Sequence, residues 1–148
     1  MVKAGLLHAK GILDFVKERI LNYNIRGRHS TPVGHLSGGN IQRVVLSREF
    51  SRDPSLLVIS EPTWGLDIVS SEFVYQKIIE MRSNRSAILL ISANLDEVLA
   101  LSDKIAVIYR GEIVAVFENK NLDRESLGEY MLGLKRQSAE EIRNGAMA

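Results

Sequence analysis

The stretch from Leu56 to Ser92 reads LLVISEPTWGLDIVSSEFVYQKIIEMRSNRSAILLIS, and its pattern decides the fold class. It opens with the apolar run Leu56–Ile59 and closes with a second run, Ala87–Ser92, each typical of a fully buried strand. Between them, a turn at Pro62–Gly65 leads to a predicted helix over about Ser70–Arg82. The apolar stripe of that helix consists of Val74, Ile78 and Met81. This strand–helix–strand order indicates an α/β fold with mainly parallel strands and flanking helices.

Upstream of this stretch, two more helices are predicted around a loop. The first covers about Leu6–Asn22, where four apolar residues recur at helical spacing, and a glycine- and proline-containing loop follows at Asn24–Gly34. Ser37 is a suitable N-cap for a second helix that ends near Ser51. The residues expected to face inward on this second helix are Ile41, Val44 and Val45.

Downstream, the pattern predicts short elements and a β-hairpin that ends the sheet. The chain becomes polar after about Lys135, which predicts a frayed helix or a polar tail over residues 136–148. The predicted elements are a helix at Leu95–Leu101, hairpin strands at Lys104–Tyr109 and Ile113–Phe117 around Arg110-Gly111, and a last helix from about Asp123.

Composition excludes several classes of function. A formal net charge of +1 gives no reason to expect nucleic acid or an anionic membrane as a partner. The chain has no cysteine, so disulfides and thiolate metal sites are excluded. No apolar run approaches the ~20 residues that span a bilayer, and residues 1–4 do not begin a signal peptide. A cytoplasmic protein is expected, which would reach a membrane only through a separate partner.

A glycine turn, Leu36-Ser37-Gly38-Gly39-Asn40, stands directly before the second predicted helix. Two glycines allow a ligand to approach the backbone closely, and the N–H groups of a first helical turn have no acceptor within the helix. Together with the Ser37 hydroxyl, these groups suit a phosphate. The alternative interpretation of Ser-Gly-Gly alone is a plain glycine turn with a serine cap.

The longer string LSGGNIQR (Leu36–Arg43), followed by SEPTWGLD (Ser60–Asp67), resembles the C-terminal half of an ABC-transporter ATP-binding domain. The resemblance implies a partial P-loop NTPase fold with a C-terminal β-hairpin. It also implies that the glycine turn contacts the γ-phosphate of an ATP molecule held by the opposite nucleotide-binding domain. The residues with this implied role in trans are Ser37, Gly38 and Gly39, supported by Asn40 and Gln42.

The carboxylate turn, Ser60–Asp67, departs from the family pattern at its first position. Members of the family usually have Asp-Glu where this chain has Ser60-Glu61, so the carboxylate that orients Mg²⁺ is missing and no metal ligand is assigned. Glu61 remains as the candidate catalytic base. The resemblance gives Asp67 a role in joining the two halves of a dimer, and a helix N-cap is compatible with the same position. Trp64 stands where relatives often have arginine.

Two further features of the family are missing from this sequence. Ala93 occupies the place of the histidine that contacts the γ-phosphate in the switch region, and no G-x-x-x-x-G-K-[ST] phosphate loop occurs. The resemblance therefore covers nearly all of the chain but only about half of a full domain. It divides the chain into residues 1–52 (helical subdomain and signature helix), 53–135 (core strands, D-loop and switch region) and the tail.

The retained and missing features resemble those of the second domain in ATPases of simple-sugar and nucleoside importers. The resulting hypothesis is a chain that completes ATP hydrolysis on a partner and is inactive alone. Expected cofactors are ATP and Mg²⁺, held mainly by a nucleotide-binding domain with a phosphate loop. A membrane permease would hold the protein at the inner face of the membrane. Self-association is expected because the apolar strands would be exposed. The alternatives are a non-catalytic oligomerising module and a free-standing anion-binding protein.

Overall fold

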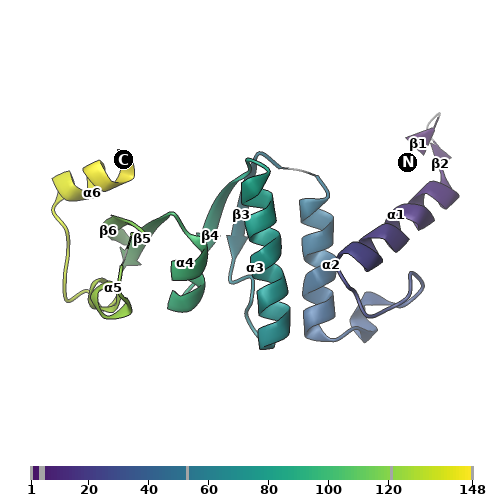
Figure 1. The fold of residues 1–148 in the computed structure, drawn as a ribbon, viewed down its shortest axis with the longest axis horizontal. Helices are drawn as coiled ribbons and strands as arrows, with labels where there is room; N and C mark the ends of the chain where they lie inside the picture. Colours follow the sequence, from purple (N-terminus) through teal and green to yellow (C-terminus); the bar gives the residue numbers. More distant parts are fainter. Residues whose placement is uncertain (1, 4–5, 53, 121, 148) are drawn as a thin grey trace. The chain divides into compact units, whose positions relative to one another are not determined.

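The computed structural model describes residues 2–3, 6–52, 54–120 and 122–147 of the 148-residue chain (Figure 1). The chain divides into two compact units, Met1–Leu89 and Leu90–Ala148. Each unit contains helices and strands, in agreement with the predicted α/β class. No helix among the described residues is long and apolar enough to cross a membrane.

In the first unit, the helix boundaries follow the side chains that cap them. Helix α1 begins at Ala9 rather than Leu6, because His8 Nδ1 accepts the N–H of Gly11 at 3.0 Å. Helix α3 begins at Ile68, because the Asp67 side chain accepts from the N–H of Ser70. The elements are β1 (Val2–Lys3), β2 (Leu6–Leu7), α1 (Ala9–Asn22), a 3-10 helix (Val33–His35), α2 (Gly38–Phe50), β3 (Leu56–Ser60), α3 (Ile68–Ser83) and the start of β4 (Ala87–Ile91).

Helix α3 buries the stripe that the sequence predicted, but α2 presents a different face. Val45 is 39% exposed, so the prediction that it points inward is wrong. Arg43 is buried instead. A long side chain of this kind can bury its aliphatic part while its guanidinium group still reaches hydrogen-bond acceptors. The buried apolar residues of this unit are Tyr23, Leu46, Phe50, Leu57, Val74, Ile78 and Met81.

Strands β3 and β4 are neighbours in one sheet and are joined through α3, the crossover connection of a β-α-β unit. Leu57 is buried, whereas Leu56 and Val58 are 59% and 58% exposed and Leu89 is 53% exposed. Because successive side chains point to opposite faces, one face of this pair is packed and the other is open. The expected exposure of these apolar runs is confirmed.

The predicted hairpin forms the centre of the second unit. Strands β5 (Lys104–Tyr109) and β6 (Glu112–Glu118) pair antiparallel, as expected. Arg110 and Gly111 connect them with φ values of 50° and 82°. Two successive positive φ angles are typical of the type I′ turn, whose twist matches that of the strands. The other helices of this unit are α4 (Leu95–Leu101), α5 (Arg124–Met131) and α6 (Ala139–Met147).

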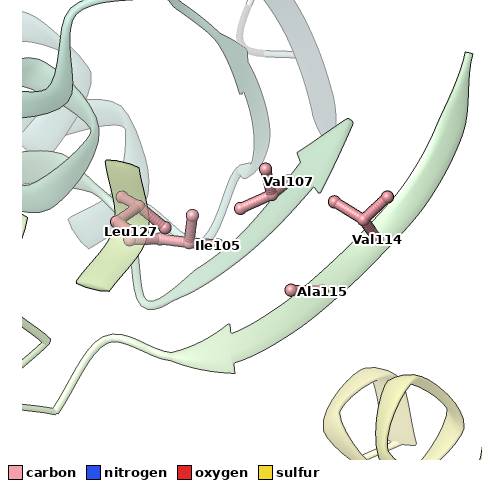
Figure 2. Packing of buried hydrophobic residues seen from close by; sticks show 5 residues of the cluster. All are labelled: Ile105, Val107, Val114, Ala115 and Leu127. Atoms are coloured by element: carbon pink, nitrogen blue, oxygen red, sulfur yellow. The ribbon is translucent and has the colours of Figure 1, made fainter. Parts of the chain in front are cut away.

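A small apolar cluster holds the hairpin against α5 (Figure 2). Leu127 on α5 is 1% exposed and packs with residues from both strands. The Asn119 side chain adds two hydrogen bonds, donating to the carbonyl oxygens of Leu99 at 2.7 Å and Ser102 at 2.8 Å. The other buried members of the cluster are Ile105, Val107, Val114 and Ala115.

Helix α6 lies in the segment for which the sequence predicted a frayed helix or a tail, and the helix is the alternative that the structure shows. Ser138 and Glu141 form a capping box, in which Glu141 accepts from the Ser138 N–H at 2.7 Å and Ser138 accepts from the Glu141 N–H. A Cβ at Gly145 would lie 2.7 Å from the Val116 carbonyl oxygen, so the helix packs directly on β6. The sequence S-A-E-E at residues 138–141 carried the signal for this helix.

We expect Leu127→Ala to destabilise the second unit by about 2–5 kcal/mol, because it leaves a cavity in the cluster. Urea unfolding followed by far-UV circular dichroism measures the change in free energy. The matched control is Leu134→Ala, at a leucine that is 73% exposed. Equal losses in the two variants would contradict the assignment of Leu127 to the core.

Candidate functional site

The glycine turn presents an open helix start in the first unit. Ser37 has an extended backbone (φ −66°, ψ 158°) and is the N-cap residue of α2. Within the described part of the chain, its hydroxyl accepts from none of the N–H groups of α2, so the expected side-chain cap is not formed. Ser37 and Gly38 are both exposed. The first-turn N–H groups and the positive end of the helix are therefore accessible to an anion.

Asn40 fixes the position of Ser37 in this turn. Asn40 Nδ2 donates to Ser37 Oγ at 2.8 Å, and Asn40 Oδ1 accepts from the backbone N–H of Arg26 at 2.6 Å. Since the Ser37 oxygen is the acceptor in this bond, its own proton remains available for an external acceptor. Asn40 thus links the glycine turn to the preceding loop and orients the Ser37 hydroxyl.

The two glycines occupy different surroundings. A Cβ at Gly38 would meet no atom within 4 Å, whereas a Cβ at Gly39 would lie 2.9 Å from Ser70 Oγ. Gly39 therefore permits a close approach between the start of α2 and the start of α3, while Gly38 faces open space. These two helix starts belong to the glycine turn and the carboxylate turn, so the structure brings the two predicted motifs together.

Gln42 and Arg43 connect α2 to neighbouring segments by hydrogen bonds within the unit. Gln42 Nε2 donates to the carbonyl oxygen of Pro62 at 2.9 Å, which ties α2 to the carboxylate turn. The Arg43 guanidinium donates to the carbonyl oxygens of Tyr23 at 3.2 Å and Asn24 at 3.4 Å, and lies 4.2 Å above the ring of Phe73. Sequence reasoning missed Arg43, because a charged residue inside an amphipathic helix is normally assigned to the exposed face.

In the carboxylate turn, Glu61 has a left-handed backbone. Its φ is 45°, a conformation that costs roughly 1–2 kcal/mol for a residue with a Cβ. Its carbonyl oxygen accepts from the N–H of Trp64 at 3.2 Å, and Pro62 between them is buried. Ser60, at the end of β3, is exposed. The turn therefore presents Trp64 to solvent, at 82% exposure.

Asp67 acts as the N-cap of α3, as one of the two interpretations of this position predicted. Its Oδ1 accepts from the backbone N–H of Ser70 at 2.8 Å. Hydrogen bonds from the Ser70 N–H, and next from its hydroxyl, lower the pKa of the Asp67 carboxyl. The carboxylate is therefore ionised at neutral pH, and it lies at the positive end of a helix, where a negative charge is stabilised.

The segment with the predicted switch residue belongs to the second unit. Ala93 is exposed, and the neighbouring Ser92 and Asn94 side chains accept from the backbone N–H groups of Asn94 and Asp96, respectively. Asp96 is exposed and pairs with Arg124 at 2.7 Å. Asp96 and Glu97 both lie in the first turn of α4, where negative charges are favoured, and Glu97 is 0% exposed.

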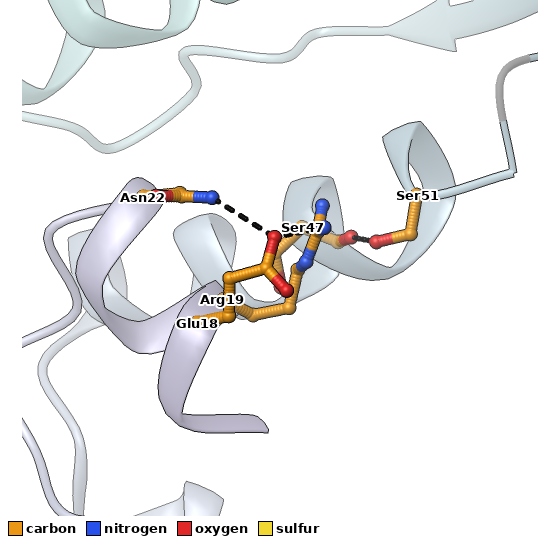
Figure 3. A network of polar contacts seen from close by, with 5 residues as sticks. All are labelled: Glu18, Arg19, Asn22, Ser47 and Ser51. Carbon is orange, nitrogen blue, oxygen red and sulfur yellow. Dashed lines mark hydrogen bonds and ion pairs between the residues drawn. The ribbon is translucent and has the colours of Figure 1, made fainter. Parts of the chain in front are cut away.

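A cavity of about 550 Å³ lies in the first unit between α1, the following loop and α2. Its walls are largely apolar, and the charged residues among those described as lining it are all basic. Arg19 contributes to the wall and pairs with Glu18 at 2.9 Å, near Ser47 of α2 and Ser51, the C-cap of this helix (Figure 3). The basic lining residues are Arg19, Arg28, His29, Arg48 and Arg52. The described residues do not gather three potential metal ligands anywhere.

Several import ATP-binding proteins are similar to the chain in sequence. It is 37% identical over 134 residues to the nucleoside import protein NupA of Lactococcus lactis subsp. cremoris, which covers 90% of this chain and 26% of that protein. It is 38% identical over 136 residues to the guanosine import protein NupO of Bacillus subtilis, covering 91% of this chain and 27% of the relative. The ribose import protein RbsA of Geobacillus kaustophilus is 35% identical over 137 residues, which is 92% of this chain and 28% of RbsA.

Solved structures show the same fold. The dimeric ATP-binding cassette MJ0796, bound to ADP and Pi, matches with a TM-score of 0.67 at 18% identity, over 81% of this chain and 52% of that one. The ABC-transporter cassette MJ1267 matches with a TM-score of 0.70 at 19% identity, over 89% and 53%.

No protein-family model matches the chain. The chain spans about a quarter of the length of the curated relatives and about half of the solved cassettes. Its sequence similarity nevertheless extends over nine-tenths of its own residues, and its fold is that of part of an ATP-binding cassette. The chain is therefore similar in sequence to ABC-importer ATP-binding proteins, among them proteins for nucleosides and ribose, and it has part of the fold of an ABC-transporter ATP-binding cassette.

Proposed function

We propose that the chain supplies its glycine turn to a composite ATP site in an importer of sugars or nucleosides. The observation that carries this proposal is the open start of α2, where the Ser37 hydroxyl is oriented by Asn40 and Gly38 faces open space. A terminal phosphate placed there would accept hydrogen bonds from the first-turn N–H groups and from Ser37. The partner domain would hold the rest of the ATP and its Mg²⁺ in a phosphate loop.

The same proposal makes the chain a poor ATPase by itself. Ser60, at the end of β3, offers an uncharged hydroxyl where a carboxylate would orient the magnesium shell. Glu61 retains a carboxylate that can act as a general base. The left-handed backbone at this residue fixes the direction in which its side chain leaves the strand. Asp67 supports the site by capping α3 beside the glycine turn and, in the paired state, by contacting the opposite domain. Gln42 acts from within, through its bond to Pro62.

A membrane permease is the second partner that this function requires, and it would bring the chain to the inner face of a membrane. The cavity between α1 and α2 is a suitable docking place on the first unit, because its apolar wall can receive an apolar side chain. The basic residues around it, among them Arg28 and Arg52, complement an acidic group on the docking segment.

The two glycines provide a matched test of the composite site. Gly38→Val should leave the fold intact, because a Cβ there meets nothing, but it should abolish the ATP hydrolysis that the chain stimulates in a phosphate-loop partner. Ser37→Ala should lower this stimulated rate by about 10²–10³-fold, as the loss of one preorganised donor does. Steady-state ATPase assays of the mixed proteins measure both effects. Full activity in Gly38→Val would end the proposal.

Titration of the chain alone with ATP and Mg²⁺ tests its dependence on a partner. We expect no turnover and no saturable binding at micromolar ATP, because neither a phosphate loop nor a metal-orienting carboxylate is present in this sequence. Isothermal titration calorimetry and a phosphate-release assay report the two properties. Saturable micromolar binding with turnover would show instead that the chain carries a complete site.

A second candidate function is a non-catalytic module that assembles with copies of itself. The open apolar face of β3 and β4, with Leu56, Val58 and Leu89 more than half exposed, favours it. Exposed strands of this kind tend to pair with another chain. Adding a phosphate-loop partner separates the two candidates, because only the first predicts ATP hydrolysis that depends on Ser37.

Self-association through this face has its own test. We expect the isolated chain to sediment as a dimer or larger species, and Val58→Lys to shift it toward the monomer, because a buried unpaired charge opposes association. The control is Ile79→Lys, at an apolar residue of α3 that is 45% exposed. A monomeric wild-type chain at moderate concentration would refute the expectation.

A further inference from the structure

The second unit ends in a segment that lies along the outer edge of the hairpin, with α6 packed on β6 (Figure 1). We propose that this segment, the C-terminal strap (residues 136–147), is a detachable cover, and that its release lets β6 pair edge to edge with β6 of a second copy of the chain. Neither the glycine turn nor a nucleotide takes part, so this surface is separate from the composite ATP site.

The turn after α5 directs the chain onto this edge. Gly133 has a φ of 73°, and its N–H donates to the Tyr130 carbonyl oxygen at 3.0 Å. The Leu134 N–H donates to the carbonyl oxygen of Glu129 at 2.9 Å. These two bonds form the Schellman motif, in which a left-handed glycine ends a helix. A Cβ at Gly133 would overlap the Tyr109 ring, so the chain leaves α5 against the end of β5.

Gln137 occupies the place of a neighbouring strand on β6. Its backbone N–H donates to the Val114 carbonyl oxygen at 3.0 Å, and its side-chain Oε1 accepts from the Val116 N–H at 2.8 Å. In an antiparallel ladder, alternate residues direct their backbone groups to the same side, so Val114 and Val116 belong to the edge that faces away from β5. Gln137 therefore satisfies a donor and an acceptor that a further strand would use.

The strap leaves the edge directly after Gln137, and its helix covers the next backbone group. The Glu141 carboxylate accepts from the Ser138 N–H at 2.7 Å, so the chain turns into α6 instead of continuing along β6. A Cβ at Gly145 would lie 2.7 Å from the Val116 carbonyl oxygen, hence the α6 backbone lies against that acceptor. An edge strand with free backbone groups is a template for pairing with another chain, and a covering helix or loop prevents this pairing.

Few interactions hold the strap in place. No residue of α6 is buried, and a helix of 9 residues is marginal in water without packing. The Arg136–Glu112 ion pair, at 2.7 Å, joins side chains that are more than half exposed, and such pairs contribute little to stability. Lys104 Nζ donates to the Ala146 carbonyl oxygen at 3.3 Å. Segments with little burial open at a small cost in free energy, so the strap can detach while the hairpin stays folded.

The sequence of β6 suits pairing with a second copy of itself. It reads EIVAVFE, which is almost the same in both directions about its centre, Ala115. Antiparallel pairing about this centre would place Val114 opposite Val116 of the second copy, and their outward backbone groups would exchange the hydrogen bonds that the strap now makes. Apolar pairs across two strands stabilise a sheet, whereas the acidic ends, Glu112 and Glu118, would oppose each other. The pairing is therefore expected to be reversible.

Gly145 and Ala146 provide a matched pair of variants in one helix. Gly145→Val forces a side chain against the Val116 carbonyl, whereas Ala146→Val places the same side chain at an exposed position. Overpacking of this kind shifts an equilibrium by about tenfold or more. We expect the association constant for dimers of Gly145→Val to exceed that of Ala146→Val by about this factor. Both chains carry Val58→Lys, which opposes association through the open face of β3 and β4, and sedimentation equilibrium measures the constants.

Amide hydrogen exchange at Val116 locates the contact. In Ala146→Val this N–H should be protected at every protein concentration, because Gln137 accepts from it. In Gly145→Val its protection should rise with concentration, because only a second copy replaces the strap. Gln137→Ala removes the acceptor without adding bulk, so it should show the same dependence even if Gly145→Val misfolds.

A Gly145→Val chain that sediments as Ala146→Val does would overturn the proposal, as would a dimer in which the Val116 amide exchanges freely. Protection of Val116 that does not depend on concentration in Gly145→Val and Gln137→Ala would also overturn it, since the strap would then not detach. ATP hydrolysis plays no part in these measurements, so failure of the composite ATP site would leave their outcome unchanged.

Discussion

The contact between the start of α2 and the start of α3 is the constraint on which the candidate site depends. Gly39 allows Ser70 to approach to a distance that a Cβ would not tolerate, and the Gln42–Pro62 hydrogen bond holds the same pair of segments together. Both helix starts are thereby fixed next to each other, one with the Ser37 hydroxyl and the other with the Asp67 cap. A shift of either helix would separate the glycine turn from the carboxylate turn that follows β3.

The polar groups in this region divide into two kinds. Some side chains form hydrogen bonds with backbone groups of the same unit, which would otherwise lack partners; these are Arg43, Gln42 and Asp67. Ser37 and Gly38 are exposed, and the Ser37 hydroxyl accepts one hydrogen bond, from Asn40. The bonds that position the glycine turn therefore do not require a ligand, as a preorganised site needs.

Sequence patterns predicted the elements whose signals are local. The Arg110-Gly111 turn, the Leu95–Leu101 helix and the α3 stripe depend on residues close in the chain, and all three were placed correctly. Burial of Arg43 and Glu97 could not be predicted, because it depends on which distant segments cover them. For α6 the polar composition left a frayed helix and a tail as alternatives, because its packing on β6 depends on a distant segment.

Two exposed apolar surfaces in the first unit differ in a way that bears on what covers them. Leu56, Val58 and Leu89 lie on regular strands, where an open face invites a further layer of the same fold or another chain. Trp64 and Ile68 lie instead on the carboxylate turn and at the start of α3, so their exposure follows from local backbone structure and not from the open face of the sheet.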